Sequence, residues 1–286
     1  MGRRASYLWR VIATGVCFAV FGLGALVLGL LVFPPLLVAV RDEAQRRRRV
    51  RAIVHRSFWA FFRFMHRVGG FTYEIAGRER LGRPGQLIIA NHPTLIDVVM
   101  IIGLTPAGCV VKEALFRNPF VRRVVQSAGY ISNGSTTEMI ERAADALRAG
   151  DTLVMFPEGT RTRPGEPFAF HRGAASVAVQ AATVLTPVYI RSEPVFLPKH
   201  RPWYRVPPTR PHLVLRVGED LDLAPYRALP PPRASRLLND WLQEHYSRAL
   251  GMGARYNPVL NEAGPGSTSA TEGPQLATTD RGVTTS

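Results

Sequence analysis

Cysteine is scarce in this sequence: its 286 residues contain only Cys17 and Cys109. Their number and spacing fit neither a disulfide framework nor a zinc site, so nothing implies an oxidising compartment. Both lie in apolar surroundings, which favours packing roles over reactive thiols. The chain also lacks a G-x-S-x-G elbow, the sequence sign of a serine nucleophile at a strand-to-helix turn.

Acidic residues are nearly absent from the first 67 positions, where twelve arginines stand against Asp42 and Glu43. This segment carries +10 of the net charge of +15, and the other 219 residues carry +5. The positive charge therefore flanks the hydrophobic N-terminal run and is not spread over the rest of the chain. That distribution favours contact with anionic lipid headgroups and argues against a nucleic-acid partner.

Charge is missing altogether from Val11 to Val40. A straight helix of this length would reach about 45 Å, more than a ~30 Å hydrocarbon core. We expect Phe33-Pro34-Pro35 to break it, leaving a membrane helix over Val11–Val32. A secretory signal peptide is disfavoured because its apolar core spans only about 7–15 residues, and a buried core helix is disfavoured further. The remaining alternative is a re-entrant hairpin that turns at Gly22-Leu23-Gly24 or at Pro34-Pro35.

Basic residues lie on both sides of this apolar run, with the larger group after it. Those before it are Arg3, Arg4 and Arg10, and those after it are Arg41, Arg46, Arg47, Arg48, Arg49 and Arg51. By the positive-inside rule the heavier side faces the cytoplasm. We therefore expect the following domain on the cytoplasmic side of a cell inner membrane. Because the N-terminus is basic too, a hairpin anchor fits this charge pattern better than a single span.

Val50 to Val68 mixes arginines with aromatic and aliphatic residues. Its apolar residues at helical spacing are Val54, Phe58, Phe61, Phe62 and Met65. Such a helix suits the headgroup layer of a membrane, and the alternative is a helix packed on the domain with a solvated basic face. We divide the chain into a membrane anchor (1–40), a basic-aromatic interfacial helix (41–70), the main domain (71–262) and a disordered tail (263–286).

Short apolar strands alternate with helical segments throughout the main domain. We expect strands over Phe71–Ala76, Leu87–Ala90, Cys109–Val111, Gly129–Ser132, Leu153–Phe156, Thr183–Ile190 and His212–Val217. We expect helices over Val98–Leu104, Ala114–Ala128, Thr136–Ala149, Gly173–Ala182 and from Arg236 through Tyr246. This alternation predicts an α/β fold, with a mostly parallel sheet covered by helices on both faces.

A histidine is followed five residues later by an aspartate in Asn91-His92-Pro93-Thr94-Leu95-Ile96-Asp97, where a strand gives way to a helix. An imidazole beside a carboxylate makes a general base, because the carboxylate orients the ring and stabilises its charged form. Within one helix these residues would lie roughly 140° apart, so His92 must lie in the turn, a break that Pro93 favours. The alternative is a capping box, in which Asp97 only satisfies backbone donors at the helix start.

A second polar stretch, Phe156-Pro157-Glu158-Gly159-Thr160-Arg161, directly follows another buried strand. Two such strand ends can meet at one edge of a sheet, where open α/β folds place their sites. Asn91-His92 with Asp97 matches the HX4D motif of the glycerolipid acyltransferases, and residues 156–161 match that family's FPEGTR motif. The chain resembles the bacterial 1-acylglycerol-3-phosphate acyltransferases and their lysolipid-acylating relatives over Phe71 to Asp222.

The resemblance implies an O-acyltransferase of phospholipid biosynthesis that works at a membrane. His92 would deprotonate a hydroxyl of the acceptor lipid, and Asp97 would orient His92. The acyl donor would be acyl-CoA or an acyl carrier protein, with no cofactor and no metal. No covalent nucleophile is expected, because the sequence shows no base for Cys109.

The same resemblance assigns the FPEGTR turn to the polar head of the acceptor. Glu158, Gly159, Thr160 and Arg161 would line this site, with Arg161 able to clamp a phosphate bidentately and Gly159 allowing close backbone approach. Arg172 is a further candidate for the same anionic pocket. The alternative is that Glu158 and Arg161 pair with each other and only shape the turn.

One segment departs from the family's pattern. Members that form phosphatidic acid usually carry an arginine shortly after the glycine of the strand between the two motifs, whereas Gly129 to Ser135 has no basic residue. The acceptor therefore stays open between 1-acylglycerol-3-phosphate, another lysolipid, and a lipid of ornithine or aryl-polyene type. A non-catalytic lipid-binding protein of the same fold is the alternative to an enzyme, and the intact motifs argue against it.

Overall fold

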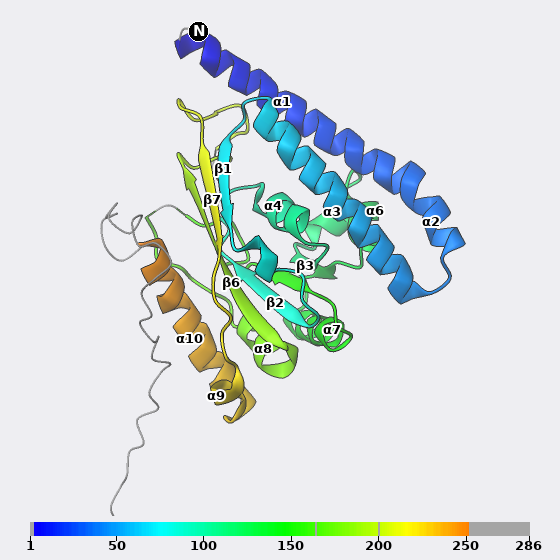
Figure 1. Ribbon diagram of the computed structural model, residues 1–286, viewed down its shortest axis with the longest axis vertical. Helices are drawn as coiled ribbons and strands as arrows, with labels where there is room; N and C mark the ends of the chain where they lie inside the picture. The colour runs from blue at the N-terminus through cyan, green and yellow to red at the C-terminus, as the bar shows by residue number, and fades with distance from the viewer. Residues whose placement is uncertain (1–2, 164, 200, 252–286) are drawn as a thin grey trace, which may run out of the picture.

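The computed structural model describes residues 3–163, 165–199 and 201–251. The tail predicted over 263–286 lies outside these residues. Within them the chain forms a seven-stranded sheet with helices on both faces, and two long helices lie along one side (Figure 1).

The sheet is parallel except for one pair of strands. Its order is β1-β7-β6-β2-β5-β3-β4, and β6 pairs with β7 in the antiparallel sense. The strands are β1 (Thr72–Ala76), β2 (Gln86–Ala90), β3 (Gly108–Val111), β4 (Ile131–Ser132), β5 (Leu153–Met155), β6 (Val184–Glu193) and β7 (His212–Val217). Strands β2 and β5 are parallel neighbours in the middle of the sheet. The two polar motifs therefore follow the carboxyl ends of adjacent central strands.

Alternate residues of β2 enter two separate cores. Ile88 and Ala90 face one core and Leu87 and Ile89 face the other, and all four are fully buried. The first core includes α3 (Glu43–Arg67), α4 (Asp97–Leu104) and α6 (Arg122–Ser127), and the second includes α7 (Thr136–Arg148), α8 (Gly173–Ala181) and α10 (Pro231–Leu250). The predicted α/β architecture, with a sheet covered on both faces, is confirmed (Figure 1).

One predicted helix is wrong in detail, since Ala114–Ala128 forms two short helices, α5 (Ala114–Arg117) and α6. Pro119 explains the break, because a proline pushes the preceding residue out of helical geometry. Asn118 is extended, with φ −72° and ψ 120°, and its side chain accepts the Phe120 N–H at 2.9 Å. The structure adds a short helix, α9 (Ala224–Arg227), and a 3-10 turn, η2 (Arg78–Arg80). The other predicted elements are present, the His212–Val217 strand with the same ends and the others with ends shifted by one or more residues.

The N-terminal run is helical almost without interruption. Helix α1 (Arg3–Val27) continues through a π-helical turn, η1 (Leu28–Val32), into α2 (Phe33–Ala39). Together Arg4–Ala39 is long and apolar enough to cross a membrane. The break expected at Phe33-Pro34-Pro35 is wrong, because the helix continues through both prolines, which lie in the first turn of α2 directly after the π-helical turn.

The chain reverses only after α2. Val40 is extended, and Asp42 caps α3 by accepting the Gln45 N–H at 2.6 Å. Neither position proposed for a re-entrant turn reverses the chain, since Gly22-Leu23-Gly24 lies inside α1 and Pro34-Pro35 inside α2.

Helices α1 and α3 lie side by side and antiparallel (Figure 1). Near the middle of α1 the Phe21 ring packs against Phe61, with ring centroids 5.3 Å apart. Near its start the Trp9 indole donates a hydrogen bond of 2.9 Å to the Val68 carbonyl. After its end, a Cβ built on Gly29 would lie 3.0 Å from the Cβ of Arg123 on α6. The N-terminal helix is thus held against the domain along its length.

Helix α3 packs on the domain through its apolar face. Its buried apolar residues are Val50, Val54, Phe62 and Met65, and its backbone at Trp59 approaches Gly103 of α4. The packing alternative raised for this helix is therefore present. Its exposed face carries arginines such as Arg56 and Arg63, so its location in a headgroup layer stays a prediction.

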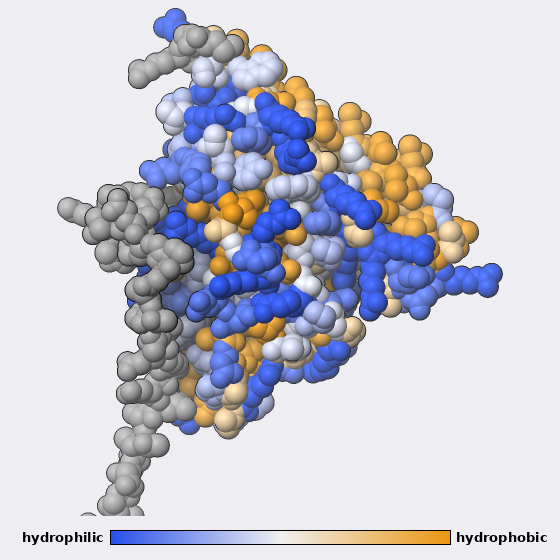
Figure 2. Space-filling view, in the orientation of Figure 1, coloured by the Kyte–Doolittle hydropathy of each residue, from blue (hydrophilic) through white to orange (hydrophobic). Residues whose placement is uncertain are grey.

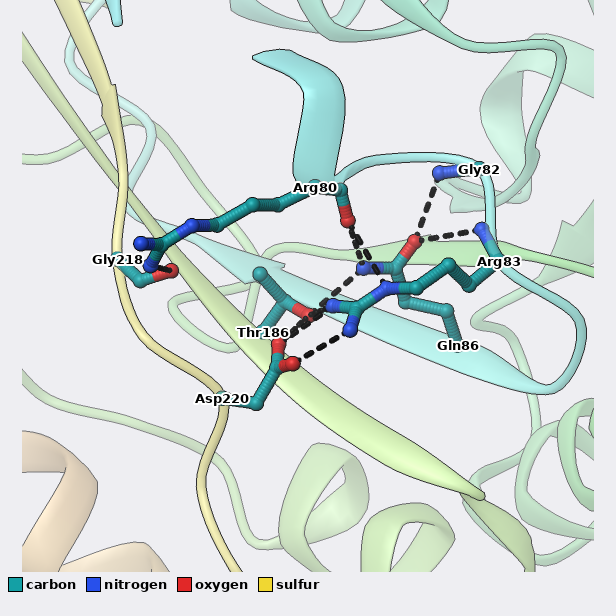
Figure 3. Close-up of polar contacts among 7 residues, drawn as sticks. All are labelled: Arg80, Gly82, Arg83, Gln86, Thr186, Gly218 and Asp220. Atoms are coloured by element: carbon teal, nitrogen blue, oxygen red, sulfur yellow. Dashed lines mark hydrogen bonds and ion pairs between the residues drawn. The ribbon is translucent and has the colours of Figure 1, made fainter. Parts of the chain in front are cut away.

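A hydrogen-bonded network fastens the amino-terminal end of β2, away from the polar motifs (Figure 3). The Arg83 guanidinium makes a bidentate pair with Asp220, at 2.5 and 2.6 Å, and also donates to Thr186. Gln86 donates to Thr186 at 2.7 Å and to the Arg80 carbonyl at 2.8 Å. The network ties η2, β2, β6 and the segment after β7 together, so its role is structural.

We expect Asp220→Asn to destabilise the protein at neutral pH and to flatten the acid side of its stability profile. The hydrogen bond from Arg83 holds the pKa of Asp220 below its ordinary value. The stabilisation is therefore complete above about pH 4 and is lost as the pH falls through the lowered pKa. Urea unfolding between about pH 7 and pH 3 measures it, with the exposed neighbour Glu219→Gln as the control. An Asp220→Asn profile that parallels the parent's would contradict the expectation.

Candidate functional site

His92 lies in the loop between β2 and α4, and its ring turns back onto the first residue of that helix. His92 Nδ1 lies 2.8 Å from Oδ2 of Asp97. The His92 side chain is 17% exposed, whereas Asp97 is fully buried. The pairing expected from the HX4D spacing is therefore present.

Asp97 accepts three hydrogen bonds, which explains how a carboxylate can be buried here. Its Oδ2 accepts from His92 Nδ1 and from the Thr94 N–H at 2.7 Å, and its Oδ1 accepts from the Thr94 hydroxyl. Asp97 thus accepts the Thr94 N–H, as the capping alternative expected, but the N-cap of α4 is Ile96, which makes no side-chain cap hydrogen bond. Because an ionised carboxylate can only accept, Nδ1 carries the proton of the neutral ring and Nε2 carries the lone pair.

The Nε2 side of the His92 ring is available to a substrate. None of the described residues makes a hydrogen bond with Nε2. The ring packs against Phe156, with centroids 4.6 Å apart, so an apolar wall borders the free nitrogen. A basic nitrogen that is oriented, partly exposed and unbonded can take a proton from a hydroxyl.

Glu158 points at the backbone of the His92 loop. Its Oε1 accepts the His92 N–H at 3.0 Å and the Thr162 hydroxyl at 2.6 Å. The Thr162 N–H in turn donates to the His92 carbonyl at 2.7 Å. The FPEGTR turn is therefore hydrogen-bonded to the HX4D loop, and the two motifs form one site. Burial is the main cause of a raised pKa at Glu158.

Arg161 does not pair with Glu158, which removes the alternative in which these two charges only shape the turn. Its Nη1 donates to the Leu197 carbonyl at 2.6 Å, and within the described chain Glu158 bonds to His92 and Thr162 instead. Partial burial lowers the pKa of Arg161, and the charge of Asp97 opposes this shift. Arg161 therefore places a cation near the histidine pair.

The remaining predicted residues of the turn are close to the site without a shown ligand role. Gly159 has φ +61° and a Cβ there would lie 3.2 Å from the ring of His171, so this turn requires glycine. The Thr160 hydroxyl is buried and has no partner among the described residues. Arg172 is exposed at the start of α8, and no hydrogen bond or ion pair joins its side chain to the described part of the site.

Two residues that hold the site were not singled out from the sequence. Asn91 joins β2 to β6, since its side chain bonds both the N–H and the carbonyl of Ile190 at 2.8 Å. The Tyr246 hydroxyl of α10 donates a hydrogen bond of 2.7 Å to the carbonyl of Ile89, which lies two residues before Asn91 in β2. The position of Asn91 inside the motif signalled it, whereas nothing near Tyr246 in the sequence did.

Lys112 is a further cation at the same edge of the sheet. It directly follows β3, which pairs with β5 in parallel, and it is exposed. Among the described residues, no group of three His, Cys, Asp or Glu side chains lies close enough to hold a metal ion. The site thus combines one oriented imidazole with nearby positive charge.

We expect Glu158→Gln to preserve the His92 loop and Glu158→Ala to loosen it. Both hydrogen bonds to Glu158 end on one oxygen, and a glutamine keeps that acceptor while alanine does not. The lost acceptor should cost about 1–3 kcal/mol in Glu158→Ala. Because the pKa of Glu158 is raised, its ionised form costs stability as the pH rises through that pKa, so Glu158→Gln should gain on the parent at neutral pH.

Amide hydrogen exchange at His92 and Thr162, together with urea unfolding, measures both effects. If Glu158→Gln exchanges as fast as Glu158→Ala, then the charge of the carboxylate, and not its oxygen, holds the loop.

Residues 72–191 match the family model described as Acyltransferase. The 1-acyl-sn-glycerol-3-phosphate acyltransferase of Borreliella burgdorferi is 29% identical over 147 residues, which cover 49% of this chain and 56% of the relative. Its namesake in Saccharomyces cerevisiae is 28% identical over 140 residues, 46% of each chain. The chain thus spans about half the length of these curated relatives.

A solved structure has the same fold. The crystal structure of the 1-acyl-sn-glycerophosphate acyltransferase PlsC from Thermotoga maritima aligns with a TM-score of 0.65 and 20% identity, over 89% of this chain and 100% of that one. The range of the family match, 72–191, contains both the HX4D and the FPEGTR motifs, which the structure joins into one site. Over residues 72–191 the chain is thus similar to the glycerolipid acyltransferases, in its family match and in its curated relatives.

Proposed function

We propose that this protein transfers a fatty acyl group from a thioester donor to a hydroxyl of a lysophospholipid. The donor is acyl-CoA or an acyl carrier protein. The observation that carries the proposal is the His92–Asp97 pair, whose unbonded Nε2 lies beside the FPEGTR turn. The names of the relatives from Borreliella burgdorferi and Saccharomyces cerevisiae support an acceptor of the 1-acylglycerol-3-phosphate type.

His92 acts as the general base of a single displacement. Its Nε2 removes the proton of the acceptor hydroxyl while that oxygen forms a bond to the thioester carbonyl carbon. The tetrahedral oxyanion then collapses and the carbon–sulfur bond breaks. The imidazolium returns the proton to the leaving thiolate, so the products are an ester and a thiol. Asp97 stabilises the imidazolium between these two transfers.

Direct transfer is favoured because neither cysteine is placed to form an acyl-enzyme. Cys109 lies fully buried in the sheet, and burial raises the pKa of its thiol to about 12. Cys17 is buried on α1. A thiol that stays protonated in a core is a poor nucleophile.

Two cations at the sheet edge suit an anionic headgroup. Arg161 uses one nitrogen on the Leu197 carbonyl and keeps further donors for a phosphate. Lys112 is exposed directly after β3, the strand that pairs with β5. The segment from Gly129 to Ser135, which has no arginine, makes hydrogen bonds that stabilise neighbouring turns and helices. Asn133 accepts the Glu113 N–H at 3.1 Å, and Ser135 caps α7. We therefore assign the headgroup phosphate to Arg161 and Lys112.

Helix α1 provides the membrane contact in this proposal. Hydrophobic side chains gather along the α1–η1–α2 edge, including Leu23, Leu31 and Val38, which are exposed (Figure 2). Because α1 and η1 are held to the domain from Trp9 to Gly29, a helix crossing the bilayer would carry parts of the domain into the hydrocarbon. We therefore propose that it lies along one leaflet and does not form the membrane-crossing helix expected over Val11–Val32.

The basic residues after α2 then meet anionic headgroups on the same side as the site. This arrangement keeps the proposal of an inner-membrane protein with its catalytic domain in the cytoplasm. It also brings the acceptor and donor lipids to His92 without extracting either one fully into water.

We expect His92→Ala to lower acyl transfer by about 10²–10⁴-fold while leaving the fold intact, because only the base is removed. The assay follows a labelled acyl group from acyl-CoA or acyl carrier protein to a panel of lysolipids in detergent. His212→Gln, a histidine on β7, is the control and should transfer at the parent rate. Substantial turnover by a folded His92→Ala protein would remove His92 from the mechanism.

We expect Arg161→Gln to raise the KM for acceptors that carry a phosphate by about tenfold or more, with a smaller effect on kcat, because a charge-assisted hydrogen bond to the headgroup is lost. A neutral lysolipid should show no such change. Arg163→Gln is the matched control, since Arg163 is exposed and pairs with Glu166. An equal loss with neutral and phosphorylated acceptors would show that Arg161 only supports the turn.

A further inference from the structure

The connection between β6 and β7 carries two exposed aromatic side chains that lie against α1. Trp203 is 45% exposed and Tyr204 is 51% exposed. Their ring centroids lie 5.8 Å apart. A Cβ built on Gly15 of α1 would lie 3.4 Å from the Trp203 ring, and the Phe18 ring lies 5.9 Å from it. The indole thus fits over the glycine and extends the apolar surface of α1.

Hydrogen bonds from two arginines, Arg10 and Arg210, hold this connection in place. Arg10 of α1 is only 7% exposed and donates to the carbonyls of Pro207 and Pro208, at 3.2 and 2.7 Å. Arg210 donates to the carbonyls of His66 and Phe71, at 2.9 and 2.7 Å. The connection that carries Trp203 and Tyr204 is therefore fixed relative to α1 and to the end of α3.

The charge beside the aromatic pair is positive. Arg201 and Arg205 flank Trp203 and Tyr204, and both are exposed. Aromatic rings with polar edges beside arginines are the composition of proteins at a lipid–water interface, where the rings lie at headgroup level and the guanidinium groups meet phosphates.

We propose that Arg201, Trp203, Tyr204 and Arg205 form a second membrane contact, which binds an anionic lipid surface beside α1. This inference rests on the membrane association proposed above, and it adds an element that neither of the two motifs nor the N-terminal helix supplies. Lipid is favoured over a protein partner because the patch continues the exposed apolar surface of α1 through Phe18 and Gly15.

The position of this contact links the membrane to the site. The same connection contributes the Leu197 carbonyl that holds Arg161, and Phe196 beside it is buried against Phe71. Binding of Trp203 and Tyr204 to lipid would therefore fix the β6–β7 connection, whose Leu197 carbonyl orients Arg161.

The test places an environment-sensitive fluorophore on single cysteines of the full chain. Tyr204→Cys probes the proposed contact, Leu23→Cys probes α1, and Asp145→Cys, on α7 across the sheet, is the control. Leu23 and Asp145 are exposed, and the native cysteines are buried. With vesicles of phosphatidylcholine and phosphatidylglycerol, the labels at 204 and 23 should brighten and be quenched by brominated lipids, while the label at 145 stays unchanged.

Affinity supplies a second measurement. The double variant Trp203→Ala, Tyr204→Ala should bind vesicles roughly fivefold to tenfold more weakly, because the missing rings no longer bury apolar surface in the lipid. Arg201→Gln with Arg205→Gln should weaken binding only when phosphatidylglycerol is present.

The outcomes separate this inference from the function it rests on. A label at 23 that inserts while the label at 204 stays in water would overturn the second contact and leave membrane association standing. Labels that both stay in water would overturn both. A response at 204 to an acyl carrier protein, without one to vesicles, would replace the lipid by a protein partner.

Discussion

The hydrogen bond between His92 Nδ1 and the buried carboxylate of Asp97 is the interaction on which the site depends. It sets which nitrogen carries the proton, and it holds the ring over the start of α4. The same carboxylate accepts two bonds from Thr94, so the loop that carries His92 is fixed by the group that orients it. Moving either residue would disturb both the tautomer and the turn.

The parallel sheet determines where this pair can work. Strands β2 and β5 are neighbours, so the loops after them meet, and the Glu158 carboxylate joins them through the His92 N–H. Asn91 fastens the end of β2 to β6. Outside this frame, α1 is held along its length and the β6–β7 connection joins it to Arg161. The His92 site, Arg161 and the apolar helix therefore belong to one connected arrangement.

Local patterns in the sequence were enough for the fold class and for the histidine pair. The spacing of His92 and Asp97 across Pro93 required the loop that the structure shows, and the alternation of strands and helices required a parallel sheet. The role of Glu158 could not be predicted, because the His92 N–H that it accepts lies in a loop 66 residues earlier in the chain. The Leu197 carbonyl that holds Arg161 lies in a connection without a motif. The break between α5 and α6 could have been predicted from Pro119 alone.

Nε2 of His92 is the basic nitrogen because Nδ1 keeps its proton and donates a hydrogen bond to Asp97. Nitrogen-15 NMR of the His92 imidazole in the neutral state tests it most directly. We expect one tautomer with Nδ1 protonated and Nε2 unprotonated, giving way to a mixture in Asp97→Asn. A neutral ring protonated at Nε2, with its lone pair on Nδ1, would contradict this assignment, since the nitrogen proposed to take the proton of the acceptor hydroxyl would have no lone pair.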